Sequence, residues 1–154
     1  MGDKRRFDLF AKLIAARFDR GLKVADVAGG QGYLQVALRE QGFADVTTFD
    51  RRYKRASNRL CYRHRYFAWD TDEKFDLVVG MHPDEGSDHI VKYATKHKVP
   101  YVICPCCIKP DAALFKAKHE FRAWVAHLRG LAPNLTCEEF YLKMNGKNLV
   151  MIGR

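Results

Sequence analysis

The sequence predicts an α/β protein with a doubly wound, mostly parallel sheet of seven strands, helices on both faces and an antiparallel hairpin at its C-terminal end. Two observations support this prediction. Short apolar runs, typical of strands buried on both faces, alternate with amphipathic segments of helical period. Near the end of the chain, Asn145-Gly146 joins two further strand-like segments, and this dipeptide is the strongest short-range signal of a hairpin.

Seven segments have the apolar composition expected of strands, as in Phe-Asp-Leu-Val-Val-Gly and Pro-Tyr-Val-Ile-Cys. In chain order they are residues 22–28, 46–49, 66–68, 75–80, 100–104, 136–143 and 147–152. Because helical segments separate the first five, these should be parallel, whereas the last two should be antiparallel neighbours.

Helices are expected where apolar residues recur every three or four positions. These segments are residues 3–18, 32–41, a short one near 54–60, and 111–130. In the first, Phe10 and Ile14 share one apolar stripe. Gly42 should end the second. Asp111 is the expected N-cap of the last helix, and Pro133 follows its end.

Length and composition predict one cytoplasmic domain over residues 1–154, with an N-terminal helix within residues 1–20 packed on the core. The five cysteines are an odd number, with three of them inside four positions, which favours reduced thiols over a disulfide framework. No apolar run approaches the roughly 18 residues of a membrane span, so no membrane partner is expected.

Positive charge gathers between Arg51 and Arg65, a stretch with seven lysines and arginines and no acid. Three tyrosines are interleaved with it or follow it: Tyr53, Tyr62 and Tyr66. Such a mixture is typical of surfaces that bind phosphates through cations and stack unpaired bases on aromatic rings. It predicts a nucleic acid, in particular RNA, as a partner, with Arg52 and Arg55 in contact with the substrate. A solvated helix face on a basic protein is the alternative.

The loop after the first predicted strand contains Gly29, Gly30 and Gly32, which allow a close approach of backbone to a ligand. The helix that follows directs its free N-terminal amides toward the same place. A dinucleotide site would need a third glycine where Gln35 stands, and a phosphate-binding P-loop would need a Lys-Ser or Lys-Thr pair after the glycines. The loop predicts a bound cofactor, and these departures disfavour a dinucleotide and a P-loop phosphate.

Asp26-Val-Ala-Gly-Gly-Gln-Gly32 resembles the first motif of the class I S-adenosylmethionine-dependent methyltransferases, with Ala28 in place of the first glycine. That family has the same alternation of strands and helices and the same final hairpin, so the resemblance covers essentially the whole chain. It implies S-adenosylmethionine as cofactor and S-adenosylhomocysteine as product. It also implies that Gly30 and Gly32 approach the methionine part and that Asp26 supports the loop and the amino group. Ala28, Gly29 and Tyr33 belong to the same expected site.

Two carboxylates after the next strands are further candidates for cofactor binding. Asp50 closes the second strand, where an acid can accept hydrogen bonds from both ribose hydroxyls. The resemblance implies that Asp70, with Trp69 beside it, meets the adenine, and we assign Arg51 to the cofactor as well. The alternatives are that Asp50 merely pairs with Arg51 or Arg52, and that Asp70 forms a turn or caps a helix.

The segment after the fourth strand, His82-Pro-Asp-Glu85, is the expected catalytic motif. An imidazole ordinarily titrates near working pH, so His82 can remove a proton from the acceptor while lying beside the cofactor, and Asp84 can orient it. Pro83 is expected at the substrate. Nucleic-acid amino methyltransferases carry Asp or Asn followed by Pro-Pro and an aromatic residue here, and this chain departs from that pattern. The alternative is that Pro83 simply starts the next helix.

Cys104-Pro-Cys106-Cys107 follows the fifth strand and is open to three interpretations. A zinc site would need a second, well-separated ligand pair, so no metal is expected. A thiolate of Cys106 or Cys107 can attack a pyrimidine ring, as in cytosine methyltransferases. The third interpretation, which we favour, is a wall that positions substrate. A branch with tRNA-modifying members resembles this chain in pairing a histidine after strand four with Pro-Cys-Cys after strand five.

Together these observations predict a methyltransferase that acts on RNA, tRNA or rRNA before DNA. A catalytically silent RNA-binding domain is one alternative, and a protein or small-molecule acceptor is another. No added recognition domain is expected within these 154 residues, so specificity is expected from the core surface, a homodimer or a partner protein.

Overall fold

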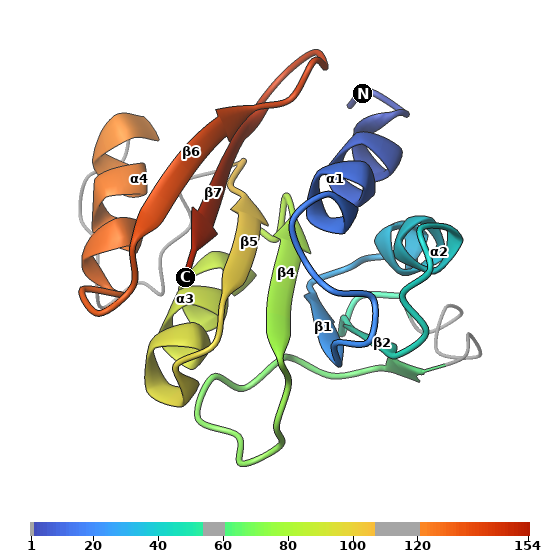
Figure 1. The fold of residues 1–154 in the computed structure, drawn as a ribbon, viewed down its shortest axis with the longest axis horizontal. Helices are drawn as coiled ribbons and strands as arrows, with labels where there is room; N and C mark the ends of the chain where they lie inside the picture. The colour runs from blue at the N-terminus through green and yellow to red at the C-terminus, as the bar shows by residue number, and fades with distance from the viewer. Residues whose placement is uncertain (1, 54–60, 107–120) are drawn as a thin grey trace.

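The computed structural model describes residues 2–53, 61–106 and 121–154. Within these ranges, seven strands form one sheet in the order β3-β2-β1-β4-β5-β7-β6 (Figure 1). The strands are β1 (Val24–Val27), β2 (Val46–Phe49), β3 (Tyr62–Arg63), β4 (Leu77–Met81), β5 (Tyr101–Cys104), β6 (Cys137–Tyr141) and β7 (Leu149–Gly153). The first five are parallel, and β7 is antiparallel to both β5 and β6. The predicted mixed sheet is confirmed.

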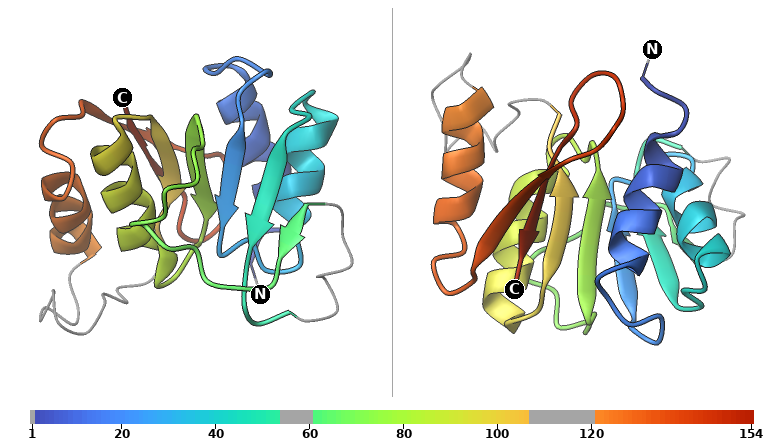
Figure 2. Two further views of the ribbon diagram at one scale, coloured as in Figure 1. Left: turned by 90° about the horizontal axis from the view of Figure 1, so that it is seen from below. Right: turned by 45° about the horizontal axis from the view of Figure 1, so that its top comes forward.

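Helices cover both faces of this sheet, as Figure 2 shows from two further directions. In the described ranges they are α1 (Arg6–Ala15), α2 (Tyr33–Glu40), α3 (Gly86–His97) and α4 (Phe121–Gly130). Ile14 of α1 and Leu34 of α2 belong to one apolar core, and Ile90 of α3 and Trp124 of α4 belong to a second. The sheet lies between these two cores.

Strand β1 shows why the central strands β1, β4, β5 and β7 are mostly apolar. Successive side chains of a strand point to opposite faces of the sheet. Accordingly, Val24 packs in the core of α1 and α2, whereas Ala25 and Val27 pack in the core of α3 and α4. Because helices cover both faces, an alternating polar pattern would bury polar side chains.

Among the elements that the structure describes, the third strand is the one that the sequence misplaces. A strand is expected at residues 66–68, but β3 is the two-residue segment Tyr62–Arg63, paired in parallel with β2 at Thr48 and Phe49. The hydroxyl of Tyr62 donates to the carbonyl of Gly30 at 2.6 Å, which holds this position in the sheet. The apolar residues 66–68 form no strand.

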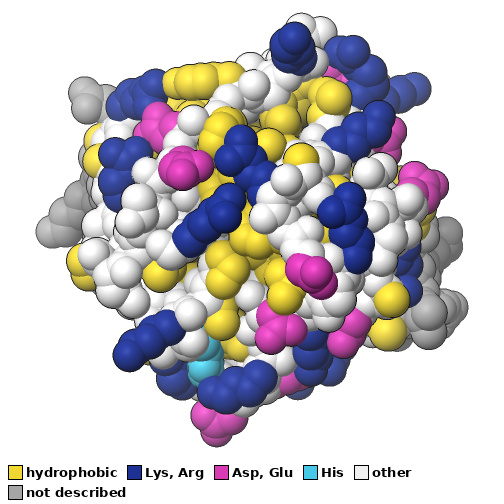
Figure 3. Space-filling view, in the orientation of Figure 1, with side chains coloured by type: hydrophobic (Ala, Val, Ile, Leu, Met, Phe, Trp, Pro, Cys, Tyr) yellow, Lys and Arg dark blue, Asp and Glu magenta, His cyan; other side chains and the backbone are white. Residues whose placement is uncertain are grey.

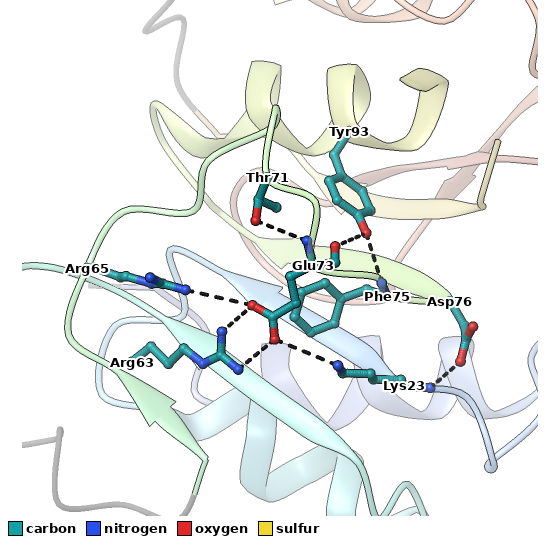
Figure 4. A network of polar contacts seen from close by, with 8 residues as sticks. All are labelled: Lys23, Arg63, Arg65, Thr71, Glu73, Phe75, Asp76 and Tyr93. Atoms are coloured by element: carbon teal, nitrogen blue, oxygen red, sulfur yellow. Dashed lines mark hydrogen bonds and ion pairs between the residues drawn. The ribbon is translucent and has the colours of Figure 1, made fainter. Parts of the chain in front are cut away.

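Hydrogen bonds and ion pairs of Glu73 connect β3 to the segment that leads into β4 (Figure 4). Arg63 forms two hydrogen bonds with its carboxylate, and Arg65 and Lys23 each bring a nitrogen within 3.7 Å. The hydrogen bonds from Arg63 are the main cause that holds the pKa of Glu73 below its ordinary value. Tyr93 of α3 completes the network, because its hydroxyl donates to the Glu73 carbonyl at 2.8 Å.

The C-terminal hairpin is confirmed. Tyr141 of β6 faces Leu149 of β7 across it, and Gly146 in its turn has a φ of +86°. The hairpin lies beside the N-terminal segment (Figure 1), and Asn145 N–H donates to Asp3 at 3.3 Å.

The other expected boundaries agree with the elements to within a few residues, and β2 coincides with its prediction. The helix expected near 54–60, with Arg55, and residues 107–120, with Cys107 and the expected N-cap Asp111, lie outside the described residues. Of the described helices, none is long and apolar enough to cross a bilayer.

Candidate functional site

A cavity of about 480 Å³ opens beside the carboxyl ends of β1, β2 and β4. Open α/β sheets bind ligands at this edge, and the volume lies in the range of small-molecule sites, roughly 300–1,000 Å³. Apolar side chains form part of its wall: Val27, Phe49, Phe67 and Pro83. Polar and charged side chains reach it from β2, from the turn after β4 and from α3: Asp50, Arg51, Arg52, Asp84, Glu85 and His89.

The glycine loop between β1 and α2 runs close against two buried side chains. A Cβ built at Gly29 would lie 2.7 Å from Cγ of Asp26 and 2.6 Å from Cγ2 of Thr48, so position 29 has no room for a side chain. Gly30 and Gly32 have φ angles of +58° and +80°, which glycine adopts without strain. Gly32 is also the N-cap of α2. The three glycines thus determine the path of this loop.

Asp26 is fully buried against the loop. Thr48 Oγ1 donates a hydrogen bond to its Oδ2 at 2.9 Å, whereas its Oδ1 has no hydrogen-bond partner among the described residues. Burial raises the pKa of Asp26 to about 7; the Thr48 hydrogen bond lowers it, and the charge of Asp50 raises it further. Ala28, two residues after Asp26, lines the cavity, and its backbone φ is +53°.

Asp50 directly follows β2 on the wall of the cavity and accepts four hydrogen bonds. Gly30 N–H and Arg52 Nη2 donate to its Oδ2, both at 2.9 Å. Its Oδ1 accepts from the backbone N–H of Arg52 at 2.7 Å and from Arg52 Nε at 3.2 Å. Burial alone would raise the pKa of Asp50, but the bonds from Arg52 and Gly30 outweigh it and hold the pKa below its ordinary value. The expected alternative, a pair with Arg52, is thus present.

Arg52 also reaches the turn after β4. Its Nη1 lies 3.3 Å from Oδ2 of Asp84, and the Sγ of Cys106 donates to Oδ1 of Asp84 at 3.1 Å. We call the contacts of Arg52 with Asp50 and Asp84 the Arg52 bridge. The bridge joins residues 32 positions apart in the sequence and spans the ends of β2 and β4.

His82 points from the end of β4 toward the hairpin. Its Nε2 lies 2.9 Å from the carbonyl oxygen of Lys147, and since a carbonyl only accepts, this nitrogen carries the proton. Burial lowers the pKa of His82, the bond to Lys147 works against this shift, and the charge of Arg6 adds to it. The backbone φ of His82 is +53°. His82 is not among the described residues that line the cavity.

Seven other predicted cofactor residues, all of them described, also lie outside the cavity wall: Asp26, Gly29, Gly30, Gly32, Tyr33, Trp69 and Asp70. Tyr33 packs on Phe7 of α1, with ring centroids 5.7 Å apart. The ring of Trp69 has Lys92 Nζ 5.9 Å from its centroid, and the carbonyl of Asp70 accepts from Lys96 at 2.9 Å. Asp70 sits in a turn, as its alternative interpretation expected.

The structure adds wall residues that have no predicted place in the site: Phe67, Gly86 and His89. Tyr66, predicted for the nucleic-acid surface, and Glu85, part of the predicted catalytic motif, line the cavity as well. The sequence predicts a strand at residues 66–68, but the third strand is Tyr62–Arg63, and Tyr66 and Phe67 lie on the cavity wall. His89 lies within the first turn of α3, seven residues after His82, and helical spacing from Gly86 would have placed it near the cavity.

Cations and aromatic rings are paired around the cavity. Arg51 lies over the ring of Tyr66 at 5.4 Å, and Arg52 lies over the ring of Tyr53 at 5.5 Å. Tyr66 is 66% exposed, although it belongs to the cavity wall. On the face drawn in Figure 3, lysine and arginine side chains are interleaved with hydrophobic and acidic ones from top to bottom.

The described cysteines are free thiols in different surroundings. Cys104 is buried, and burial raises its pKa to about 12, so it stays protonated. Cys106 is half-buried and bonded to Asp84. Within residues 2–53, 61–106 and 121–154, no three His, Cys, Asp or Glu side chains converge as metal ligands would.

No protein-family model matches the sequence, and neither does any curated protein. Solved structures, however, share its fold. One is the 1,6-didemethyltoxoflavin N1-methyltransferase of Burkholderia thailandensis, with bound 1,6-didemethyltoxoflavin and S-adenosylhomocysteine. The TM-score is 0.64 at 18% identity, over 99% of this chain and 79% of that one.

Two further structures are similar. The ribosomal protein L11 methylase of Lactobacillus delbrueckii subsp. bulgaricus gives a TM-score of 0.63 at 14% identity, over 100% of this chain and 80% of that one. A methyltransferase in complex with the Haloferax volcanii Trm112 activator gives 0.61 at 14% identity, over 97% and 90%. This chain therefore has the fold of the class I S-adenosylmethionine-dependent methyltransferases, as its glycine-loop motif predicts.

Proposed function

We propose that the protein is an S-adenosylmethionine-dependent methyltransferase. The observation that carries this proposal is the carboxylate of Asp50, which stands at the end of β2 on a cavity of about 480 Å³ and is bonded to the glycine loop through Gly30. A carboxylate in this place can accept hydrogen bonds from the two hydroxyls of a ribose. The fold supports the proposal, because methyltransferases share it.

The residues present fit such a cofactor. Asp50 suits the ribose, and the unused Oδ1 of buried Asp26 suits the positively charged amino group of the methionine part. A cation there would favour the ionised form of Asp26, which burial disfavours. Phe67 and Tyr66 offer an apolar wall for the adenine. We assign the adenine to these two, since Trp69 and Asp70 do not line the cavity.

When bound, the cofactor supplies a methyl group on an electrophilic sulfonium centre. The protein must hold the acceptor in line and remove its proton where needed. We assign proton removal to Asp84, which lies on the cavity between Arg52 and Cys106. We assign His82 to positioning this turn, because it is bonded to the hairpin at Lys147.

The cofactor proposal is tested by calorimetry with S-adenosylhomocysteine. The wild-type protein is expected to bind it, and Asp50→Asn is expected to bind it more than tenfold more weakly, because hydrogen bonds to a charged acceptor contribute roughly 1.5–3 kcal/mol each. Asp45→Asn, at an exposed position just before β2, is the matched control and should bind normally. Absence of binding by the wild type, or equal binding by Asp50→Asn, would contradict the proposal.

We further propose that the acceptor is RNA. Support comes from the formal charge of +9 and from the pairs of cations with exposed rings at the cavity, Arg51 with Tyr66 and Arg52 with Tyr53. Such pairs suit phosphates and the faces of unpaired bases. The similar structures include enzymes named for a small molecule and for a ribosomal protein, so these acceptors are the competing candidates.

Transfer of a labelled methyl group to total RNA, DNA and protein extract tests the acceptor. We expect the label in RNA, and we expect Asp84→Asn to transfer it about a hundredfold more slowly, the size typical of a lost general base. His82→Gln should lose less. Label in protein alone would overturn the RNA proposal, and an unchanged rate in Asp84→Asn would overturn the role of Asp84. Cofactor binding without transfer would favour the catalytically silent alternative.

We also propose that substrate recognition is completed by a second copy of the chain or by a partner protein. We place the protein in the cytoplasm, because its described cysteines are free thiols, which stay reduced there: Cys61, Cys104, Cys106 and Cys137. A methyltransferase of the same fold was solved in complex with an activator protein. Light scattering of the pure protein distinguishes these two cases, because only a second copy doubles its molar mass.

A further inference from the structure

The carboxylate of Asp50 is saturated with hydrogen bonds. Its two oxygens offer about four lone-pair sites, and four donors occupy them. Two of these donors are backbone N–H groups, of Gly30 and Arg52, and are fixed by the course of the loops. The other two, Nε and Nη2, belong to the side chain of Arg52. A pair of hydroxyl groups can therefore reach Asp50 only where the Arg52 side chain withdraws.

The Arg52 side chain is able to withdraw. It is 49% exposed, whereas the side chain of Asp50 is 2% exposed, so the cation is the member of the pair that faces solvent. Its second ion pair, with Asp84, is a single contact at 3.3 Å, and its guanidinium also lies over the ring of Tyr53 at 5.5 Å. Displacement of Arg52 from Asp50 therefore leaves a guanidinium edge unpaired on the wall of the cavity, beside the turn after β4.

We propose that Arg52 couples cofactor binding to the binding of a phosphate-bearing acceptor. A vicinal diol that binds Asp50 displaces Nε and Nη2 of Arg52, and the released guanidinium edge then binds a phosphate of the acceptor. A guanidinium edge matches two phosphate oxygens as well as it matches a carboxylate. The inference rests on the proposed function, because the diol in question is the cofactor ribose.

The coupling must be reciprocal. A ligand that raises the affinity for a second ligand is itself bound more tightly in the presence of the second, by the same factor. We expect a factor of about five, at the lower end of typical coupling, because the Arg52 side chain is partly solvated. Without an acceptor, the Arg52 bridge competes with the ribose and weakens cofactor binding.

The experiment measures two affinities in the full-length protein: S-adenosylhomocysteine by calorimetry, and a fluorescent single-stranded RNA oligonucleotide by anisotropy. In the wild type, a saturating amount of either ligand should tighten the other about fivefold. In Arg52→Ala, S-adenosylhomocysteine alone should bind more tightly than to the wild type, because Asp50 is freed, and the coupling should disappear. Arg52→Lys retains the charge but not the paired N–H donors of a guanidinium edge, so it should keep RNA affinity and lose most of the coupling.

Arg51→Ala is the matched control, because it removes the neighbouring cation, whose ring contact is with Tyr66. It should weaken RNA binding and leave the coupling intact. Equal or weaker cofactor binding in both Arg52 variants, or coupling that persists in them, would overturn the inference while leaving the cofactor site in place. Failure of the wild type to bind S-adenosylhomocysteine would instead overturn the proposed function.

Discussion

Gly29→Ala is expected to lower the free energy of unfolding by about 3 kcal/mol, the upper range for overpacking, and to abolish binding of S-adenosylhomocysteine. The added Cβ would lie 2.6 Å from Cγ2 of Thr48 and 2.7 Å from Cγ of Asp26. Both neighbours are buried in the centre of the sheet, so neither can yield cheaply. The loop must move instead, and with it the N–H of Gly30 that is bonded to Asp50.

Urea unfolding followed by circular dichroism measures this change, and calorimetry measures the loss of binding. Gly130→Ala is the matched control, because a Cβ there meets nothing within 4 Å at the end of α4. It should leave stability within about 1 kcal/mol of the wild type, since alanine is the better helix former. A Gly29→Ala protein of wild-type stability would show that the loop is not tightly packed against β1 and β2.

Asp26→Asn is expected to become more stable than the wild type as the pH rises, by up to about 4 kcal/mol above pH 7. The pKa of Asp26 is raised by burial to about 7, from an ordinary value of 3.8. Between these two values the unfolded chain loses the proton and the folded chain keeps it, so the wild type loses stability over this window. Asparagine has the shape of the protonated acid and does not titrate.

The measurement is the difference in unfolding free energy between Asp26→Asn and the wild type from pH 4 to pH 8. Taking the difference cancels the other titrating groups. It should be smallest near pH 4, grow up to about pH 7 and then level off. Asp45→Asn serves again as the control and should show no such growth. A difference that is flat with pH would mean that Asp26 is ionised throughout in the folded protein.

Much of the fold follows from local sequence, because strands buried on both faces must be apolar. β2 coincides with its predicted residues, and the Asn-Gly turn gives the hairpin. The failure at β3 has a physical reason. Tyr62 and Arg63 belong to a strongly basic segment that reads as solvent-exposed, and their place in the sheet depends on distant partners, Gly30 and Glu73. Short-range patterns contain no information about such contacts.

The candidate site was predictable where it depends on strand ends and less so where it depends on side-chain direction. The rule that ligands lie at the carboxyl ends of parallel strands located Asp50, Pro83 and Asp84, which all line the cavity. The same rule does not predict that the backbone at His82 has a positive φ or that its ring is hydrogen-bonded to the carbonyl of Lys147. Nor can it tell that Arg52 reaches Asp84, because this contact exists only after the sheet is assembled.

The two edges of the sheet have a consequence for how copies of the chain behave in a crowded solution. An exposed edge strand invites another strand to pair with it, and natural proteins counter this with short edges and charge. Here the β3 edge is two residues long and is flanked by Arg65, and the β6 edge carries Glu138 and Glu139. Arg17, just after α1, pairs with Glu138, and Arg122 and Arg129 of α4 pair with Glu139. Both open ends of the sheet are thereby protected against edge-to-edge aggregation.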